Sequence, residues 1–377
     1  MPRVQIPGLG PEQYLGWSVD VSGDTAIVGA PRSSEFGEGS GSALLFQRGE
    51  DGSWRSIARI PSPVHQADAR FGSAVAIHGD YAAVAPIVQQ RPGEVYVYAR
   101  RPDGSWDIEH PAILRSGTFL PDDQFGYALD MDRGQLIVGQ GSTPQGKTLY
   151  ASGQAWVFER TGPGNRWSAG TPLTREHFDP VNEGFGRSVG IDGEWALVGA
   201  EPGQSGNDTS ATLFRRVKAG SWKRVTELRN PGTPHANVKF GISVALRDGL
   251  AVVGAPGAGA VYVYRLQEGT ETWSGPSLLY HPVVEQDPKM AAWFRFGVDV
   301  DTQGGRVLAG YPTYPMSGTG GAMLFEWTGS AWKATNLTAA DRGDSFGAAV
   351  ALDGDRIVVG DWHSSAQALF SGAIFAR

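Results

Sequence analysis

Short runs of alternating apolar and polar residues follow one another along most of the chain, separated by glycine and aspartate. The run from Phe346 to Leu352 leads into the turn Asp353-Gly-Asp355 and then into a second apolar run that ends at Gly360. A period of two predicts β-strands, and turn residues between two such runs predict antiparallel hairpins. No segment shows the 3.6-residue period of an amphipathic helix, so we expect an all-β fold.

The hairpin pattern occurs in seven units, each of which opens with a Phe-Gly pair or its variant, 50 to 60 residues after the previous one. The second run of a unit ends in Gly-Ala-Pro in the clearest copies, at Pro31 and Pro256. This regular spacing indicates a repeat architecture in which neighbouring units stack on each other. The opening pairs are Leu15-Gly16, Phe71-Gly72, Phe125-Gly126, Phe185-Gly186, Phe240-Gly241, Phe296-Gly297 and Phe346-Gly347.

Each unit has room for four strands. A third apolar run, such as Val261–Tyr264, follows a loop of variable length, and a fourth run begins at a tryptophan in six of the units. Four short antiparallel strands per repeat are typical of a propeller blade. We therefore predict an all-β, seven-bladed β-propeller with four-stranded antiparallel blades and a single domain, residues 1–377. The tryptophans, which we interpret as blade packing, are Trp54, Trp106, Trp167, Trp222, Trp273 and Trp332.

The two ends of the chain are predicted to meet. The seventh unit stops at Arg377, after its third strand, whereas residues 2–7 precede the first unit. We expect residues 2–7 to complete the last blade as its fourth strand, because this pairing would close the ring and remove two exposed sheet edges.

The Phe-Gly and Gly-Ala-Pro signatures resemble the FG-GAP repeat, which is known from the propeller at the head of integrin α chains, from a fungal lectin and from many bacterial proteins. The segment Phe346–Gly360 is similar to the short bacterial type of this repeat. The resemblance covers essentially the whole chain and implies a seven-bladed β-propeller. It implies no particular function, because propellers host both binding and catalysis.

The integrin-like version of the repeat has a calcium loop of alternating aspartates between its first two strands, so the resemblance raises the question of calcium. Most of the corresponding turns here are too short to surround an ion. Asp130 with Asp132, and Asp299 with Asp301, come nearest, but each pair offers only two carboxylates. We therefore expect plain turns, with no metal and no cofactor.

Composition excludes several classes of function. The net charge is −7 and the basic residues are scattered, so no basic stripe is present that would bind nucleic acid. The absence of cysteine excludes disulfides, thiolate metal sites and a thiol nucleophile. No apolar run resembles a secretion signal or a membrane span. We expect a soluble monomer that makes no membrane contact, cytoplasmic as the sequence stands and secreted if a signal has been removed.

The loops that follow the second strands share one face of a propeller, around its central channel. Scaffold positions repeat from unit to unit, whereas a single asymmetric site needs positions that do not. Four units depart from Ala-Pro in these loops and carry polar or aromatic residues instead, which makes them candidates for such a site. The candidate ligand-binding residues among these departures are Gln140, Glu201, Tyr311 and Trp362.

The last two units hold the densest group of candidates. A carboxylate and an imidazole beside an aromatic wall are suited to proton transfer, or to holding a polar ligand by stacking and hydrogen bonding. If the protein is an enzyme, Asp361 and His363 are its predicted acid and base. The alternative is that Asp361 caps a turn while Trp362 and His363 pack the loop. The group consists of Tyr311, Tyr314, Asp361, Trp362 and His363, with Trp293 and Arg295 just before the sixth Phe-Gly pair.

Three basic residues share one position in the repeat. Arg70, Lys239 and Arg295 each stand immediately before a Phe-Gly pair. Equivalent positions converge in a ring, so these side chains are candidates to hold a carboxylate or another anion together. Alternatively, they are solvated loop charges.

The sequence leaves three functions open. The first is a propeller without catalytic activity that binds a peptide, a protein, a small molecule or a glycan at one asymmetric site in its top-face funnel. The second is a metal-independent lyase, isomerase or cyclase that uses His363 and Asp361. The third is a lectin with several glycan sites, although the top-face residues do not repeat as identical sites require.

Overall fold

The structure is a computed structural model of residues 1–377. It describes the chain except residues 7–9, 11, 36, 65, 88–91, 118–123, 142–152, 175–182, 203–209, 232–237, 314–319, 340–342, 344 and 365–371, and except the side chains of residues 183, 201, 202 and 292.

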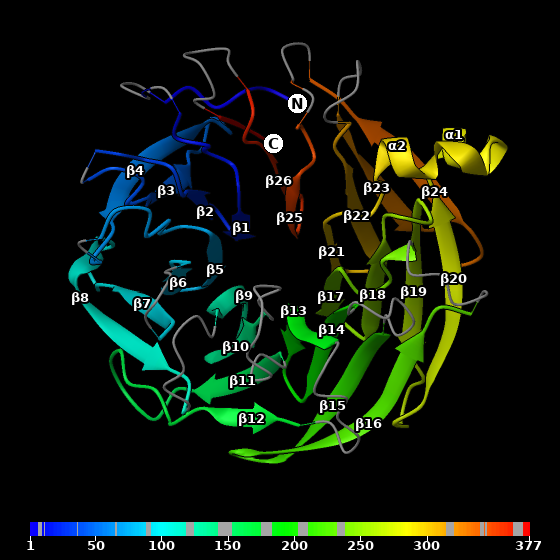
Figure 1. The fold of residues 1–377 in the computed structure, drawn as a ribbon, viewed down its shortest axis with the longest axis horizontal. Helices are drawn as coiled ribbons and strands as arrows, with labels where there is room; N and C mark the ends of the chain where they lie inside the picture. Colours follow the sequence, from blue (N-terminus) through cyan, green and yellow to red (C-terminus); the bar gives the residue numbers. More distant parts are fainter. Residues whose placement is uncertain are drawn as a thin grey trace, which may run out of the picture.

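Seven antiparallel sheets surround a common centre like the blades of a propeller (Figure 1). Six sheets have four strands and the seventh has three, and hydrogen-bonded neighbours within a sheet are always consecutive along the chain. The predicted seven-bladed all-β propeller is thereby confirmed. The innermost strands of blades 1 to 7 are β1, β5, β9, β13, β17, β21 and β25.

The strands of the first four blades have the following bounds. Blade 1 contains β1 (Val19–Ser22), β2 (Thr25–Ala30), β3 (Ser42–Arg48) and β4 (Trp54–Pro61), and blade 2 contains β5 (Ala74–His78), β6 (Tyr81–Ala85), β7 (Glu94–Arg100) and β8 (Trp106–Arg115). Blade 3 contains β9 (Phe125–Asp132), β10 (Gln135–Gln140), β11 (Gln154–Glu159) and β12 (Thr171–Leu173), and blade 4 contains β13 (Glu183–Asp192), β14 (Trp195–Pro202), β15 (Ser210–Lys218) and β16 (Ser221–Arg229).

The last three blades complete the ring. Blade 5 contains β17 (Ser243–Arg247), β18 (Leu250–Ala255), β19 (Ala260–Leu266) and β20 (Trp273–Tyr280), and blade 6 contains β21 (Val300–Gln303), β22 (Arg306–Tyr311), β23 (Gly321–Trp327) and β24 (Trp332–Leu337). Blade 7 contains β25 (Ala349–Asp353), β26 (Arg356–Asp361) and β27 (Ala373–Ala376).

The described part of the all-β chain also contains a few short helical turns, all in one connection. Between β20 and β21 lie α1 (Pro282–Gln286), the short 3-10 helix η2 (Pro288–Met290) and α2 (Ala291–Phe294). Local capping explains them: the His281 side chain accepts a hydrogen bond from the Val283 amide, and proline occupies the first helical turn. These turns are too short to produce a helical period in the sequence. None of the described helices is long and apolar enough to cross a membrane.

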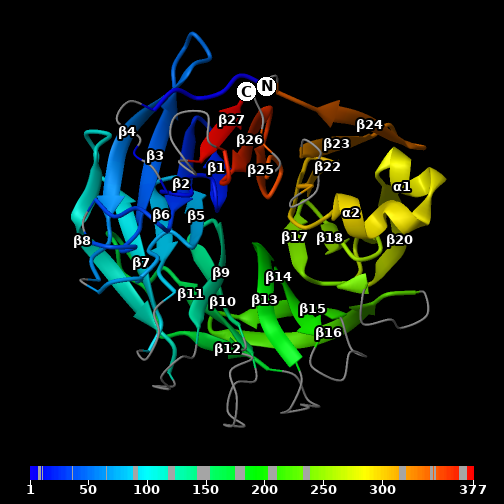
Figure 2. The same ribbon diagram turned by 45° about the horizontal axis from the view of Figure 1, so that its top comes forward.

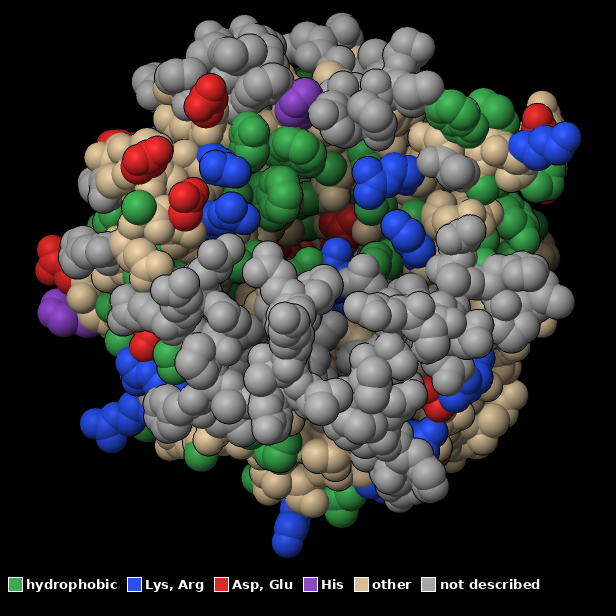
Figure 3. Space-filling model, in the orientation of Figure 1, with side chains coloured by type: hydrophobic (Ala, Val, Ile, Leu, Met, Phe, Trp, Pro, Cys, Tyr) green, Lys and Arg blue, Asp and Glu red, His purple; other side chains and the backbone are tan. Residues whose placement is uncertain are grey.

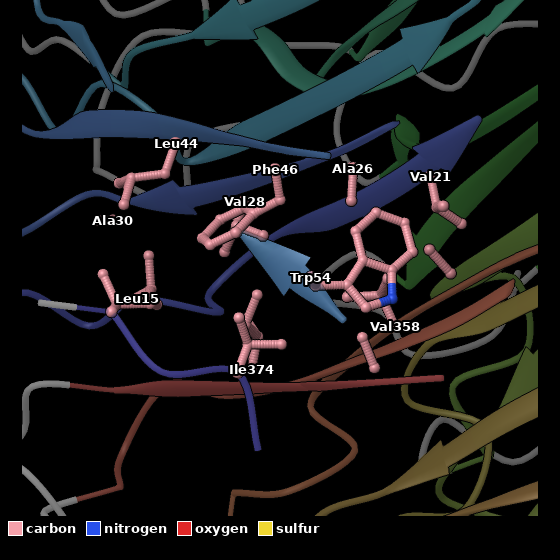
Figure 4. Close-up of a cluster of buried hydrophobic side chains, with 14 residues drawn as sticks. Leu15, Val21, Ala26, Val28, Ala30, Leu44, Phe46, Trp54, Val358 and Ile374 are labelled. Atoms are coloured by element: carbon pink, nitrogen blue, oxygen red, sulfur yellow. The ribbon is translucent and has the colours of Figure 1, made fainter. Parts of the chain in front are cut away.

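Apolar side chains pack mainly between neighbouring blades, in seven clusters of described residues. Figure 4 shows the cluster that joins blade 1 to blade 7, in which Phe46 and Trp54 from blade 1 meet Val358 and Ile374 from blade 7. Each of these four side chains is at least nine-tenths buried. Each blade therefore depends on both neighbours for the burial of its apolar faces.

The two glycines of the repeat mark a close approach between blades. A Cβ on Gly29, in β2, would lie 1.9 Å from the carbonyl oxygen of Gly72 in the next blade, so no side chain fits there. Gly72 has a φ of +90°, which favours glycine, and its carbonyl oxygen also accepts a hydrogen bond from Ser18 Oγ at 2.9 Å. The same approach recurs between Gly139 and Gly186, Gly199 and Gly241, Gly254 and Gly297, Gly310 and Gly347, and Gly360 and Gly16.

The chain ends lie beside each other at the seventh blade (Figures 1 and 2). Among the described residues that blade has three strands, and an isolated antiparallel bridge links Arg3 to Phe375, so a fourth strand from residues 2–7 is not shown. Residues 2–4 nevertheless contact β27: the Val4 amide donates to the Ile374 carbonyl oxygen at 3.0 Å, and the Ala376 amide donates to the Pro2 carbonyl oxygen at 3.2 Å. Closure of the ring by the amino-terminal segment stays a prediction.

Replacing Val4 with aspartate tests this closure. Val4 is buried in the cluster between blades 1 and 7, so a charge there would disrupt the contact. We expect Val4→Asp to lower the melting temperature by about 4 °C or more, measured by circular dichroism. Gln5→Ser, at the exposed neighbouring position, serves as the control. Equal melting temperatures for Val4→Asp and the parent would argue against closure.

Candidate functional site

A cavity of about 820 Å³ runs along the axis of the propeller. The seven innermost strands and the residues just before them line it, so equivalent positions of the repeat form rings around the axis. We call the end of the cavity at which the innermost strands begin the channel mouth.

One ring inside the channel contains aspartates in three blades. Asp20, Asp130 and Asp301 occupy the same repeat position on β1, β9 and β21, opposite Ile27, Ile137 and Leu308 of the second strands. The other four blades have small residues there: Ala76, Gly190, Ala245 and Ala351.

These carboxylates connect neighbouring blades. Oδ2 of Asp20 accepts a hydrogen bond from the Ile77 amide of blade 2 at 2.7 Å, while its Oδ1 accepts from the amide of Val21. Asp130 and Asp301 make the equivalent bonds to amides of blades 4 and 7, at 2.7 and 2.6 Å. The ring therefore ties three pairs of blades together through charge-assisted hydrogen bonds.

One cation, Arg247 on β17, faces these acids. Its Nη1 lies 3.8 Å from Oδ1 of Asp132, a fully buried residue on β9. Burial alone would lower the pKa of Arg247, but the carboxylates of Asp130 and Asp301, with those of Asp132 and Asp20, raise it above its ordinary value. Arg247 thus stays charged and offsets part of the negative charge inside the channel.

The acids nevertheless have raised pKa values. They line the cavity, yet the surrounding blades enclose them and separate them from bulk solvent. Burial raises the pKa of Asp130 and of Asp299 to about 6, and that of Asp301 to about 7, against the opposing effect of their amide donors. Burial, together with the charge of Asp130, also raises the pKa of Asp20. Between about pH 4 and pH 7 the folded protein therefore binds protons here that the unfolded chain has released.

We predict that Asp301 makes stability fall as pH rises from about 4 to 8, because the buried carboxyl loses its proton. Asp301→Asn keeps an acceptor oxygen but no charge, so its stability relative to the parent should increase with pH. Since one pKa unit corresponds to about 1.4 kcal/mol, the shift at Asp301 allows a change of about 4 kcal/mol at most. Urea unfolding of both proteins across this range measures the difference between their free energies of unfolding, in which the effects of all other titrating groups cancel. A constant difference would contradict the raised pKa.

Arg247→Met should destabilise the fold more at high pH than at low pH. Removing one partner of an enclosed ion pair leaves the carboxylates uncompensated, and we expect a loss of about 2–4 kcal/mol at about pH 8. At about pH 5.5 the loss should be smaller, because the acids then carry protons. Urea unfolding at both pH values measures this difference, and an equal loss would show that Arg247 acts only through packing.

The channel mouth has an aromatic side formed by blades 7 and 1. The rings of Trp17 and Trp362 lie 5.2 Å apart at an angle of 59°, and Tyr14 packs against Trp362 at 5.3 Å. Trp17 is 42% exposed, and both indoles line the cavity. An indole surface is therefore open to a ligand that enters the channel.

Blades 4 to 6 form a cationic side of the same mouth. Arg187, Lys239 and Arg295 all line the cavity, and the Arg187 guanidinium lies 4.4 Å from the ring centroid of Tyr127. Lys239 and Arg295 are exposed, and no carboxylate of a described residue lies within ion-pair distance of either. Figure 3 shows Lys and Arg side chains around the central hollow, with hydrophobic and acidic groups visible within it.

The structure brings three of the predicted site residues to the cavity: Trp362, Lys239 and Arg295. His363 contacts the Trp362 ring at 5.2 Å but is not part of the lining. Arg70 is half-buried and does not line the cavity, although it shares the repeat position of Lys239 and Arg295.

Other candidates point into the blades. Asp361 is fully buried, and its Oδ2 accepts a hydrogen bond from the Gly343 amide. Tyr311 is also buried: its hydroxyl is 2.6 Å from Asn336 Oδ1, and its ring packs on His281. Gln140 accepts a hydrogen bond from the indole N–H of Trp156.

Three further predictions fall elsewhere. Trp293, on α2, is 48% exposed but does not line the cavity. Tyr314 and the side chain of Glu201 lie outside the described residues. The structure thus separates the predicted group on the last two blades into channel, core and surface residues.

Sequence reasoning missed three residues of the mouth: Trp17, Tyr127 and Arg187. Each immediately follows the opening pair of its unit, where the other units have Ser73, Ile242, Val298 and Ala348. A comparison of the seven copies at this position would have found them, because large aromatic or charged residues stand out there among smaller ones. Trp17 is less conspicuous because it stands within a strand pattern, which favours a packing role.

The two aspartate pairs considered for calcium have other partners. One oxygen of each carboxylate accepts an amide hydrogen bond from the following blade, namely from Ile191 and Gly193 for blade 3 and from Val350 and Leu352 for blade 6. Within the described part of the chain, no group of three or more His, Cys, Asp or Glu residues is arranged to hold a metal ion.

Comparisons with known proteins support the repeat and the fold. The family model of the FG-GAP repeat matches residues 10–46, 54–98 and 333–376. No curated protein sequence matches the chain significantly. A chain in the crystal structure of the mitotic checkpoint complex is similar over 100% of this chain and 92% of its own length, with 12% identity and a TM-score of 0.55.

A crystal structure of a Lactobacillus plantarum protein is similar over 91% of this chain and 90% of its own length, with 10% identity and a TM-score of 0.55. At such low identity these similarities concern the fold alone. The matched segments come from both ends of the chain, where Phe-Gly and Gly-Ala-Pro signatures also occur. The chain is therefore a seven-bladed β-propeller that contains FG-GAP repeats.

Proposed function

We propose that this protein is a binding module without catalytic activity, and that its ligand binds at the channel mouth. The proposal rests on one observation: at the channel mouth, equivalent positions of the repeat carry different residues in different blades. Seven repeats build a ring in which packing residues recur from blade to blade, yet the mouth has indoles on blades 7 and 1 and cations on blades 4 to 6. One asymmetric ligand requires such unlike groups, whereas packing alone does not.

The chemistry of the mouth fits binding. A concave site with an apolar wall and a few converging polar groups is typical of ligand pockets. The exposed indole of Trp17 offers a stacking surface, while Lys239 and Arg295 offer charges that no described carboxylate neutralises. Seven packed blades form a rigid frame that holds these groups at fixed distances. Few side chains or loops therefore have to be ordered when a ligand binds, which lowers the entropic cost of binding.

The two alternatives have less support. The proposed acid Asp361 is enclosed and occupied by a backbone amide, so it is poorly placed to exchange protons with a substrate. A lectin with several equal sites would repeat its polar and aromatic contacts, and the mouth residues differ among the blades.

Fluorine NMR of fluorotryptophan-labelled protein tests the proposal. A library of small fragments is added, and the signals of Trp17 and Trp362 are identified by their loss in Trp17→Phe and Trp362→Phe. We expect bound fragments to shift these two signals first, because both indoles line the cavity. Trp327, on the outside of blade 6 and 37% exposed, is the matched control for nonspecific contact.

The outcome against the proposal is equally concrete. Fragments that shift Trp327 as much as Trp17 and Trp362, or no fragment that shifts the mouth signals at all, would refute a site at the mouth. Turnover of any substrate that His363→Ala abolishes would favour an enzyme instead.

A further inference from the structure

The cationic side of the mouth consists of three neighbouring blades. Arg187 comes from blade 4, Lys239 from blade 5 and Arg295 from blade 6, and all three line one cavity. Lys239 and Arg295 stand at the same position of the repeat, with φ values of +55° and +45°. The same left-handed backbone occurs at Arg70, so it belongs to this repeat position and does not depend on the residue that occupies it.

The charge of the channel changes sign with depth. The cations lie at the mouth, and Asp20, Asp130 and Asp301 lie further along the innermost strands: Asp301, for example, follows Arg295 by six residues. Arg247, the cation at this level, pairs with Asp132 at 3.8 Å. An anion would consequently be attracted to the mouth and repelled from the interior, which fixes how deep it can enter.

The aromatic side adjoins one end of the cationic side and lies across the mouth from the other end. In ring order, blades 7 and 1 follow blade 6, so the Trp17 and Trp362 indoles adjoin Arg295 on one side of the cavity and face Arg187 and Lys239 across it. A ligand that satisfies both sides has a negatively charged group next to a flat apolar group. Planar apolar groups pack well on indole, and guanidinium groups pair with carboxylates through two parallel hydrogen bonds.

We infer that the channel mouth binds an organic carboxylate whose carboxyl group neighbours a planar apolar group. The carboxylate lies on Lys239 and Arg295, and the planar group packs on Trp17 and Trp362. Both a free aromatic acid and a peptide with an acidic residue beside an aromatic one have this chemistry. This inference rests on the proposed function, since it names the ligand class of the same site.

Pairs of probes that differ only in the carboxylate test whether the negative charge of the ligand is required. The first pair is 2-naphthoate and its uncharged amide, and the second is the blocked dipeptide Ac-Phe-Asp-NH2 and its counterpart Ac-Phe-Asn-NH2. Isothermal titration calorimetry should show each acid binding about 10-fold more tightly than its neutral partner, because charge-assisted hydrogen bonds are lost in the latter. Whichever acid binds more tightly identifies the source, free acid or peptide.

Three variants locate the carboxylate. Lys239→Gln and Arg295→Gln should each weaken binding of the acid about 5- to 10-fold and leave the neutral probe unchanged. Arg70→Gln is the matched control, because Arg70 has the same repeat position and a φ of +51° but does not line the cavity. It should change binding less than about 2-fold, and higher salt should weaken only the acid. Equal melting temperatures confirm that the variants are folded.

Two results would overturn the inference. One is equal affinity of acid and neutral probe with shifts at Trp17 and Trp362, which would leave binding at the mouth intact and remove only the carboxylate. The other is tight binding of the acid that Lys239→Gln and Arg295→Gln do not affect. If no compound of any charge shifts the mouth tryptophans, the proposed function fails together with the inference.

Discussion

At six of the seven contacts between blades, the neighbours meet backbone to backbone at a pair of glycines, and the rest of the structure depends on this approach. At the seventh contact, Ala85 of blade 2 lies beside Gly126 of blade 3. In the first pair of blades a Cβ on Gly29 would reach within 1.9 Å of the Gly72 carbonyl oxygen, so any side chain would force the blades apart. The approach sets the distance at which the inner strands of adjacent blades lie. It also sets the apolar contacts behind them, including the cluster in Figure 4. The glycines of the Phe-Gly and Gly-Ala-Pro signatures are present because the backbones of neighbouring blades come so close.

Because the inner strands come close, a side chain on one strand can reach the backbone of the next. The aspartates of the channel use this reach: Asp20, Asp130 and Asp301 each accept an amide hydrogen from the following blade. The bonds stabilise the ring but bring several carboxylates together inside the channel, and the charge of Arg247 offsets part of that cost. The aspartates inside the channel therefore repel one another in part, whereas the mouth has solvent-exposed cations and an exposed indole.

The fold could be predicted almost entirely from the sequence, because the residues that stacked repeats need for packing recur at the same positions in each copy. The helical segment from Pro282 to Phe294 escaped, since its turns depend on local caps such as His281 and not on a long periodic pattern. The amino-terminal segment was expected as a strand, and the contact with β27 is more limited than that.

The candidate site was predictable in part. Lys239 and Arg295 could be recognised because they share a repeat position that converges on the axis. Asp361 and Tyr311 could not be excluded, because the sequence does not show whether a side chain at the end of a second strand turns toward the channel or into the blade. Trp17 was overlooked because its strand pattern suggested packing, whereas in the structure it lines the cavity.

The positions of the channel aspartates make the order of the blades around the ring important. Aspartate occupies blades 1, 3 and 6, and small residues occupy the blades between them, so no two carboxylates of this ring are adjacent. Each aspartate also needs a neighbour whose own side chain at that level is small, as Ala76, Gly190 and Ala351 are. The blades are consequently not interchangeable parts. Duplicating, deleting or exchanging one would bring like charges together or leave an amide without its acceptor, so the sequence of each blade specifies its neighbours as well as its own fold.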